Sequence, residues 1–377
     1  MVRHRGASAG APAVGSPGGA RMKVLVIGGT GAFASRVTAA CLASGDDVMV
    51  VSRGQRATPA DQQAGQRTDR TTERTDAGRP GALTWLQADR ATLASHQREV
   101  EAFAPDAVVD AICFDAAGAR LLAQVSASAR RVVLISTVDV YGEEVGAEPV
   151  TEEREPAPVT PYARGKLAAE RTLLDAVGPR ATIVRPSHML GRGFRTAGLW
   201  GRTEHVVARL CAGRPVAVLD GGRGVITPVW AGDVAAWVQA SLTAPRADGE
   251  VVNAVGGEIT TMRRYLEAIA AHLGVTPRLL PVPSTVVRDA LGTAAQFAFH
   301  RPYSCAKAVR LLGHEPAGTL ASMVAETVDA MPVRRLGVDT DLPPELLAAD
   351  AAEDAIAEVV DRQARELAVV LAANDPR

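Results

Sequence analysis

The sequence predicts an α/β fold: a doubly wound parallel sheet of the Rossmann type, followed by a smaller C-terminal substrate-binding lobe. Short apolar runs alternate with segments of helical spacing through the first half of the chain, which is the pattern of strands joined by crossover helices. A glycine-rich turn, GGTGAFA, joins the first apolar run to the first helical segment. The 377 residues, 47% of them hydrophobic, suffice for about two structural units.

The predicted strands of the sheet are short apolar runs. They are KVLVIGG from Lys23, DDVMVVSR from Asp46, ALTWLQA from Ala82, DAVVDAI from Asp106, RVVLIST from Arg131 and ATIVRPS from Ala181. Segments with helical spacing lie between them, at 33–44, 91–104, 116–128 and 160–177. Strands separated by helices of this length pair in parallel through right-handed crossovers.

Composition divides the chain into further segments. We expect residues 1–21 to form a disordered leader, residues 22–190 a dinucleotide-binding Rossmann domain, and residues 54–80 a polar insertion within that domain. Residues 191–335 are the expected substrate-binding lobe, which interleaves with the last strands of the sheet. In the helical tail, 336–377, apolar residues recur at helical spacing. This spacing fits a helix docked on the body or, alternatively, an oligomer contact.

Charge and cysteine content exclude several classes of protein. A net charge of -1 creates no field that would gather nucleic acid. The chain has no run of about 18 apolar residues that could span a membrane. Its 4 cysteines form no CxxC or Cys/His cluster, which favours a reducing cytoplasm and argues against a metal site. We therefore expect a cytoplasmic protein that acts on a small molecule.

The turn GGTGAFA, 28–34, follows a predicted strand and opens a helix. Glycines at this place let the backbone approach a pyrophosphate, and the helix N-terminus supplies unpaired amides. The expected cofactor contacts in this turn are Gly28, Thr30, Gly31, Ala32 and Phe33. Ala34 replaces the usual third glycine, and alanine is tolerated at that packing position.

The end of the second strand bears on the choice of dinucleotide. An NAD site usually carries an acidic residue there, whereas this chain has Ser52 and Arg53. A guanidinium suits a 2′-phosphate, so NADP is favoured over NAD. Asp89, after the third strand, could accept a hydrogen bond from the adenine amino group or simply cap the next helix.

The stretch STVDVYG, 136–142, leaves the fifth strand at the edge where open α/β sheets bind ligands. Tyr162 and Lys166 follow on a predicted helix, where a spacing of four residues puts them on one face. Lysine occurs at only three positions among 41 Lys and Arg residues, which indicates that an ammonium is required at Lys166. A phenol has a pKa of about 10, and we expect the ammonium to lower it. With the Thr137 hydroxyl orienting a substrate oxygen, these groups predict hydride transfer at a carbonyl.

A second Tyr/Lys pair, Tyr303 and Lys307, has the same spacing. It lies outside the alternating domain and follows no strand-end hydroxyl. We expect Tyr303 to mark a structural helix start.

Together these motifs resemble the extended short-chain dehydrogenase/reductase superfamily, in its NAD-dependent epimerase/dehydratase group. The motifs are GGTGAFA, DAVVDA, STVDVYG, YARGK, VRPSHMLG, TPVWAGDVAAW and SCAKAVRLLGHEP, and they cover the chain from Met22 to about Met331. The resemblance implies that Tyr162 is the general acid/base, that Lys166 also binds the nicotinamide ribose and that Thr137 polarises the substrate. It also implies cofactor contacts from Tyr162, Ala111 and Pro186, and a lobe that holds a substrate, commonly a nucleotide-linked sugar.

Other functions remain open at this stage. Sugar-nucleotide dehydratases of this group carry an acidic pair after the threonine, and here Val138 and Asp139 occupy those places. Asp139 therefore predicts either a dehydratase or an acid that fixes the loop. The stretch GRGFRTAGLWGRTEHVVARL also resembles the chloroplast stem-loop-binding-like relatives. The alternative to a reductase or epimerase is accordingly a non-catalytic scaffold that binds a dinucleotide or associates with RNA. A homodimer is compatible with both functions.

Overall fold

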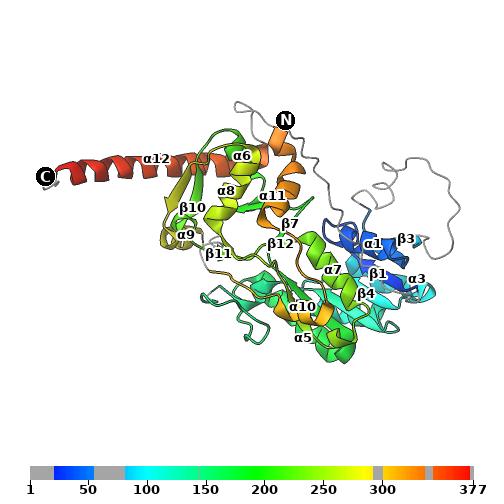
Figure 1. Ribbon diagram of the computed structural model, residues 1–377. Coiled ribbons are helices and arrows are strands. Elements are labelled where there is room, and N and C mark those ends of the chain that lie inside the picture. The colour runs from blue at the N-terminus through cyan, green and yellow to red at the C-terminus, as the bar shows by residue number, and fades with distance from the viewer. Residues whose placement is uncertain (1–20, 55–80, 144, 292–299, 336–342, 374–377) are drawn as a thin grey trace, which may run out of the picture.

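The computed structural model describes residues 21–54, 81–143, 145–291, 300–335 and 343–373. The predicted leader and polar insertion lie outside these ranges, apart from Arg21 and Gly54. The described chain consists of a sheet covered by helices, a lobe built from the later residues, and a long C-terminal helix (Figure 1).

The central sheet has seven parallel strands in the order β13-β6-β5-β4-β1-β2-β3. The strands are β1 (Lys23–Ile27), β2 (Asp47–Ser52), β3 (Leu83–Gln87), β4 (Ala107–Asp110), β5 (Arg131–Ile135), β6 (Ala181–Pro186) and β13 (Val251–Ala254). The predicted fold class is therefore confirmed. The order of strands reverses between β1 and β4, and such a switch point opens a crevice at the carboxyl edge of a sheet.

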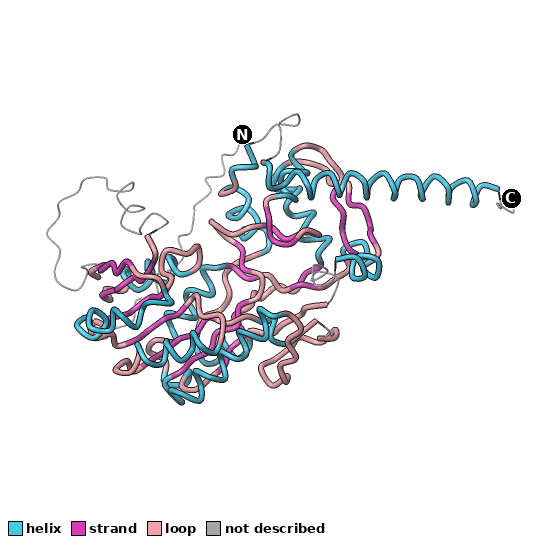
Figure 2. Tube along the Cα trace, turned by 180° about the vertical axis from the view of Figure 1, so that it is seen from behind, coloured by secondary structure: helices cyan, strands magenta, loops and turns pink. Residues whose placement is uncertain are grey.

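Helices cover both faces of this sheet, as its continuous apolar strands require. One face packs against α1 (Ala34–Ala43) and α7 (Ala231–Ser241), where the fully buried Trp237 lies. The other face packs against α4 (Ala116–Val125) and α5 (Pro161–Val177). Figure 2 shows the same layers from behind.

The helix predicted at 91–104 is interrupted. Residues Arg90–His96 form a 3-10 helix, η2, and only Gln97–Phe103 form an α-helix, α3, which ends at Ala104 with φ 53°. Asp89 begins this segment, because its side chain accepts a hydrogen bond from the Ala91 amide at 2.8 Å. Asp89 therefore caps this helix, as one of its two predicted roles requires.

The lobe contains small sheets and several helices. Its strand pairs are β7 (Met189–Leu190) with β12 (Val229–Trp230), β8 (Thr196–Gly198) with β9 (Gly201–Thr203), β10 (Val216–Leu219) with β15 (Leu279–Val282), and β11 (Val225–Ile226) with β14 (Thr260–Thr261). Its helices are α6 (His205–Cys211), α8 (Met262–Leu273), α9 (Ser284–Leu291) and α11 (Leu320–Asp329). The remaining short helix, α10 (Ala306–Leu312), contacts β13 and α7 of the sheet domain.

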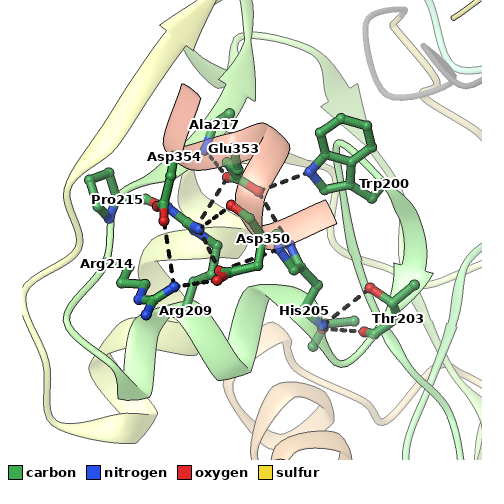
Figure 3. A network of polar contacts seen from close by, with 11 residues as sticks. Trp200, Thr203, His205, Arg209, Arg214, Pro215, Ala217, Asp350, Glu353 and Asp354 are labelled. Atoms are coloured by element: carbon green, nitrogen blue, oxygen red, sulfur yellow. Dashed lines mark hydrogen bonds and ion pairs between the residues drawn. The ribbon is translucent and has the colours of Figure 1, made fainter. Parts of the chain in front are cut away.

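The C-terminal helix α12 (Pro344–Ala373) is docked on the lobe along its first half. Arg209 of α6 is fully buried and donates to Asp350 at 2.5 Å and to Asp354 at 2.7 Å (Figure 3). Glu353 accepts from the Trp200 indole at 3.0 Å and lies 3.2 Å from the His205 ring. Burial raises the pKa of Glu353 to about 7 and lowers the pKa of His205 to about 4.

The second half of α12 extends away from the body (Figures 1 and 2). Leu367 is 59% exposed and Val369 is 69% exposed. The prediction of a docked amphipathic tail is therefore wrong for this half, because no element of the described chain covers it. The alternative, an oligomer contact, stays a prediction. Among the residues placed in the structure, no helix has both the length and the hydropathy needed to cross a bilayer.

Candidate active site

A cleft of about 920 Å³ opens at the switch point between β1 and β4. It lies between the glycine turn, the ends of β2 and β3, and the start of α4. The predicted cofactor residues that line it are Gly28, Thr30, Gly31, Ser52, Arg53 and Asp89. The predicted contacts Ala32, Phe33, Ala111, Tyr162, Lys166 and Pro186 do not line this cleft.

The glycine turn has a shape that other residues could not adopt. Gly28 has φ +81°, and a Cβ atom there would lie 2.8 Å from a methyl group of Ile112. The side chain of Phe33 is buried in the core and provides no cap for α1. The first amides of α1 therefore lack a side-chain cap at the mouth of the cleft, which is the arrangement that binds phosphates. Ala34, in place of the third glycine, is packed in the core at 1% exposure.

The residues expected to select the dinucleotide lie together at one end of the cleft. The Ser52 hydroxyl accepts from Thr30 at 3.0 Å and from the Gly54 amide at 3.1 Å. The Arg53 side chain is 63% exposed, and its Nε lies 4.0 Å from an oxygen of Asp89. An ion pair this long and this exposed leaves the guanidinium available to a ligand.

Sequence reasoning missed the pair formed by Arg90, which lines the cleft, and Asp110 of β4. Arg90 donates to Asp110 at 2.5 Å and to the Gly118 carbonyl at 2.8 Å, and the Asp110 side chain is fully buried. The pair ties the ends of β3 and β4 to the start of α4. The sequence signal for this pair is Asp110, an acid at the end of the otherwise apolar run of β4. A buried acid of this kind requires a cationic or hydrogen-bonding partner.

The predicted catalytic residues meet beside this cleft. Thr137 follows β5 and caps a 3-10 helix, η3 (Val138–Tyr141), by accepting from the Asp139 amide at 3.1 Å. Tyr162 lies in the first turn of α5, which Thr160 begins by accepting from the Ala163 amide. The Thr137 hydroxyl lies close enough to the Tyr162 phenol to lower its pKa. Phe114, a residue of the cleft wall, has its ring 6.3 Å from that of Tyr162.

Lys166 lies beneath the Tyr162 ring and is almost completely buried. Its ammonium donates to the carbonyls of Cys113 and Ile135, both at 2.8 Å. The same nitrogen lies 4.7 Å from the ring centroid of Phe114 and 5.9 Å from that of Tyr162. A guanidinium is larger and planar and could not make these two carbonyl contacts in the same space. Burial lowers the pKa of Lys166 to about 8.

The expectation that Lys166 lowers the pKa of Tyr162 is wrong in this structure. Burial raises the pKa of Tyr162, and the carboxylate of Asp139 raises it further. The positive charge of Arg202 and the nearby Thr137 hydroxyl lower it by less. The reason is geometric: the Lys166 ammonium is held by two backbone carbonyls under the ring. The phenol is therefore protonated at neutral pH.

Asp139 is held by an ion pair that the sequence does not reveal. Its Oδ1 accepts from Arg301 Nη1 at 2.6 Å, and both side chains are mostly buried. They line a second pocket of about 30 Å³ on the lobe side of Thr137. His188 also lines that pocket, and its ring meets Tyr265 edge-on at 5.9 Å. Burial places the pKa of His188 well below its usual value, so the ring is neutral.

The pair Tyr303 and Lys307 does not share a helix face, because α10 begins only at Ala306. Lys307 forms an ion pair with Glu250 at 2.7 Å. The backbone of Tyr303 forms an isolated parallel β-bridge with that of Val150. The expected helix start at Tyr303 is therefore wrong, because α10 begins three residues later. Tyr303 instead lines the 30 Å³ pocket.

A buried polar network supports the site from below. Glu170, one helical turn after Lys166, pairs with Arg185 of β6 at 2.5 Å and accepts from the Ser136 hydroxyl. Arg185 also donates to the Tyr141 hydroxyl at 2.8 Å, and Tyr141 in turn donates to Asn253 at 2.9 Å. The network therefore joins α5 to β5, β6, β13 and η3.

Comparison with known proteins bears on the family and the fold. A sequence model of the NAD dependent epimerase/dehydratase family matches residues 24–255. The chain is 30% identical over 276 residues to the 2′-dehydrokanamycin reductase of Streptomyces kanamyceticus, covering 72% of this chain and 73% of the relative.

Two solved structures show the same fold. The dTDP-glucose 4,6-dehydratase of Bacillus anthracis in complex with NAD has a TM-score of 0.64 at 17% identity, covering 82% of this chain and 96% of that one. The UDP-glucose 4-epimerase of Thermotoga maritima with UDP-glucose has a TM-score of 0.62 at 20% identity, covering 82% and 98%.

Proposed function

The chain belongs to the NAD-dependent epimerase/dehydratase family, and on that premise we propose that it reduces a carbonyl group of a sugar-like small molecule with a nicotinamide dinucleotide. The observation that carries this proposal is the position of the Tyr162 phenol, with its ring 5.9 Å from the Lys166 ammonium and 6.3 Å from the ring of Phe114, which lines the dinucleotide cleft. Reduction of a carbonyl needs a proton donor at its oxygen, and a protonated phenol is such a donor. The relative named as a reductase supports the same direction.

The cleft fits a dinucleotide. Its glycine turn lies so close to Ile112 that a side chain at Gly28 would collide with it, and this turn leads into α1, whose start has no side-chain cap. A pyrophosphate would be held there by amides, with Arg53 and Asp89 near the adenosine end. When bound, the nicotinamide supplies the hydride.

The residues of the chain supply the proton and its environment. Tyr162 donates its proton to the oxygen on which negative charge develops, while the Thr137 hydroxyl holds that oxygen. Lys166 lies beneath the ring, and its proposed role there is to bind the nicotinamide ribose. The two carbonyl contacts of Lys166 fix its ammonium in place.

The ion pair of Asp139 with Arg301 argues against the dehydratase alternative. A dehydratase needs an acid that is free to move a proton at a neighbouring carbon. Asp139 instead accepts a hydrogen bond from Arg301 at 2.6 Å. This geometry favours the interpretation in which Asp139 fixes the loop.

We expect NADPH to be the preferred cofactor, with Arg53 as the cause. Arg53→Gln should weaken NADPH binding by about 10- to 100-fold, because a charge-assisted hydrogen bond is worth about 1.5–3 kcal/mol. NADH binding should change little, since NADH lacks the 2′-phosphate. Fluorescence titration of both cofactors measures this, with Arg223→Gln, an exposed arginine of the lobe, as the matched control. Equal weakening of both cofactors would contradict the assignment.

The proposed function is tested by the nucleotide that the purified protein retains and by its turnover. Mass and absorbance identify the bound nucleotide, and oxidised sugars and nucleotide sugars are then screened for oxidation of the reduced cofactor. We expect stoichiometric oxidation of the cofactor with at least one ketone. Interconversion of a nucleotide sugar without net cofactor oxidation would show an epimerase instead. Salt-dependent retention of RNA with no turnover would favour the scaffold.

A further inference from the structure

The 30 Å³ pocket beside Thr137 is a built polar site. It brings together residues from η3, from the loop after β6, from β9 and from the segment before α10. The side chains that matter here are Asp139, His188, Arg202, Arg301 and Tyr303. Because Thr137 lines this pocket and its hydroxyl lies close to the Tyr162 phenol, a group bound in it lies next to the proposed reaction centre.

Two buried donors in this pocket lack a partner. Tyr303 is only 3% exposed, and its hydroxyl makes no hydrogen bond within the described chain. The Nε of Arg301 is also unpaired there, although the Nη1 of the same side chain binds Asp139. A buried polar group without a partner costs about 1–3 kcal/mol. Both groups therefore suit a ligand that accepts hydrogen bonds.

The charges in the pocket sum to one net positive charge. Arg202 is exposed and Arg301 is mostly buried, and among the described residues that line the pocket the only carboxylate is that of Asp139. His188 contributes no charge, because burial keeps its ring neutral. A monoanion is thus the best electrostatic match.

Size separates the candidate anions. The pocket is small, at about 30 Å³. A carboxylate is planar and small enough for such a space, and it presents oxygens to two donors at once. A tetrahedral phosphate is larger and carries more charge than this pocket balances.

We propose that this pocket binds a carboxylate of the substrate, so that the substrate is a keto acid or an oxidised sugar acid. This inference rests on the proposed function and names the substrate class for it. Arg202, Arg301 and Tyr303 hold the carboxylate oxygens, and the reacting carbonyl lies a few bonds away at Thr137 and Tyr162. Asp139 orients Arg301 and limits the pocket to a single negative charge.

The test compares ligands that differ in the carboxylate. Binding of glucuronate, lactate, glucose and inorganic phosphate to the full chain with bound NADPH is measured by calorimetry and by ligand-observed NMR. We expect glucuronate to bind at least about tenfold more tightly than glucose, a difference of about 1.4 kcal/mol. Arg202→Gln and Tyr303→Phe should each remove that difference, and Arg223→Gln should not.

Asp139→Asn should change carboxylate affinity in the direction opposite to Arg202→Gln and Tyr303→Phe. It removes the negative charge and releases Arg301, so carboxylate binding should become tighter while glucose binding stays the same. Both Tyr303→Phe, which deletes an unpaired hydroxyl, and Arg202→Gln, at an exposed position, are expected to fold.

Three results would overturn the carboxylate site. They are equal binding of glucuronate and glucose, carboxylate binding that is unchanged in both variants, and tighter binding of phosphate than of either carboxylate. Each of these outcomes leaves the proposed function standing, because turnover on neutral ketones and NADPH binding are measured separately. Absence of any nucleotide binding would instead count against the proposed function.

Discussion

Replacing Tyr162 with phenylalanine is expected to lower the rate of carbonyl reduction by about 10²- to 10⁴-fold, the usual contribution of a positioned proton donor. The ring would remain, so its contacts with Phe114 and its place over Lys166 would be kept. Only the hydroxyl close to Thr137 would be lost. Cofactor affinity should therefore change by less than about twofold, because Tyr162 does not line the dinucleotide cleft.

The measurement is single-turnover oxidation of bound reduced cofactor by the substrate that the screen identifies. Lys166→Arg serves as a second variant at the same site, and Lys307→Arg, at the surface pair with Glu250, is its matched control. Lys166→Arg should lose turnover, whereas Lys307→Arg should not. Retention of more than about a tenth of the wild-type rate by Tyr162→Phe would mean that another group donates the proton.

The direction of the pKa shift at Tyr162 sets the expected pH dependence. Because burial and Asp139 raise the pKa of this phenol above its ordinary value, the acid form predominates through the neutral range. The reduction rate should stay flat there, whereas the reverse oxidation needs the phenolate and should rise about tenfold per pH unit. Asp139→Asn removes the second cause of the raised pKa, so its oxidation profile should move to lower pH.

The fold and half of the site follow from local patterns in the sequence. Apolar runs with β-branched residues, separated by helical spacing, predict six of the seven strands of the sheet, because parallel strands are buried on both faces; β13 was not predicted. The glycine turn, Thr137 and Tyr162 were found because each follows a strand end or opens a helix. Their neighbours in space are then determined by the topology alone.

The other half of the site depends on contacts between distant segments. Arg301 reaches Asp139 across 162 positions of the chain, and Arg202 comes from a hairpin of the lobe. No local spacing encodes such a meeting. The sign of the pKa shift at Tyr162 was mispredicted for the same reason, because burial and the exact position of an ammonium are properties of the packed structure.

Replacing Arg185 with alanine is expected to lower the free energy of unfolding by about 3–5 kcal/mol, because it leaves the carboxylate of Glu170 buried without its partner. The side chains of Arg185 and Glu170 are only 6% and 2% exposed. Urea denaturation measures the loss. Arg130→Ala, which breaks the surface pair with Asp106 at 79% and 32% exposure, should cost less than about 1 kcal/mol.

The double variant Arg185→Met with Glu170→Leu distinguishes the effect of the buried charges on stability from their effect on catalysis. It removes both buried charges at once, so it should recover much of the lost stability. Catalysis should not recover with it, because the Ser136 and Tyr141 hydroxyls lose the partners that tie α5 to β5 and η3. A stable double variant with normal turnover would show that this network supports only the fold. A stable variant with slow turnover and normal cofactor affinity would show that Glu170 and Arg185 hold Tyr162 at the distance from Thr137 that proton transfer requires.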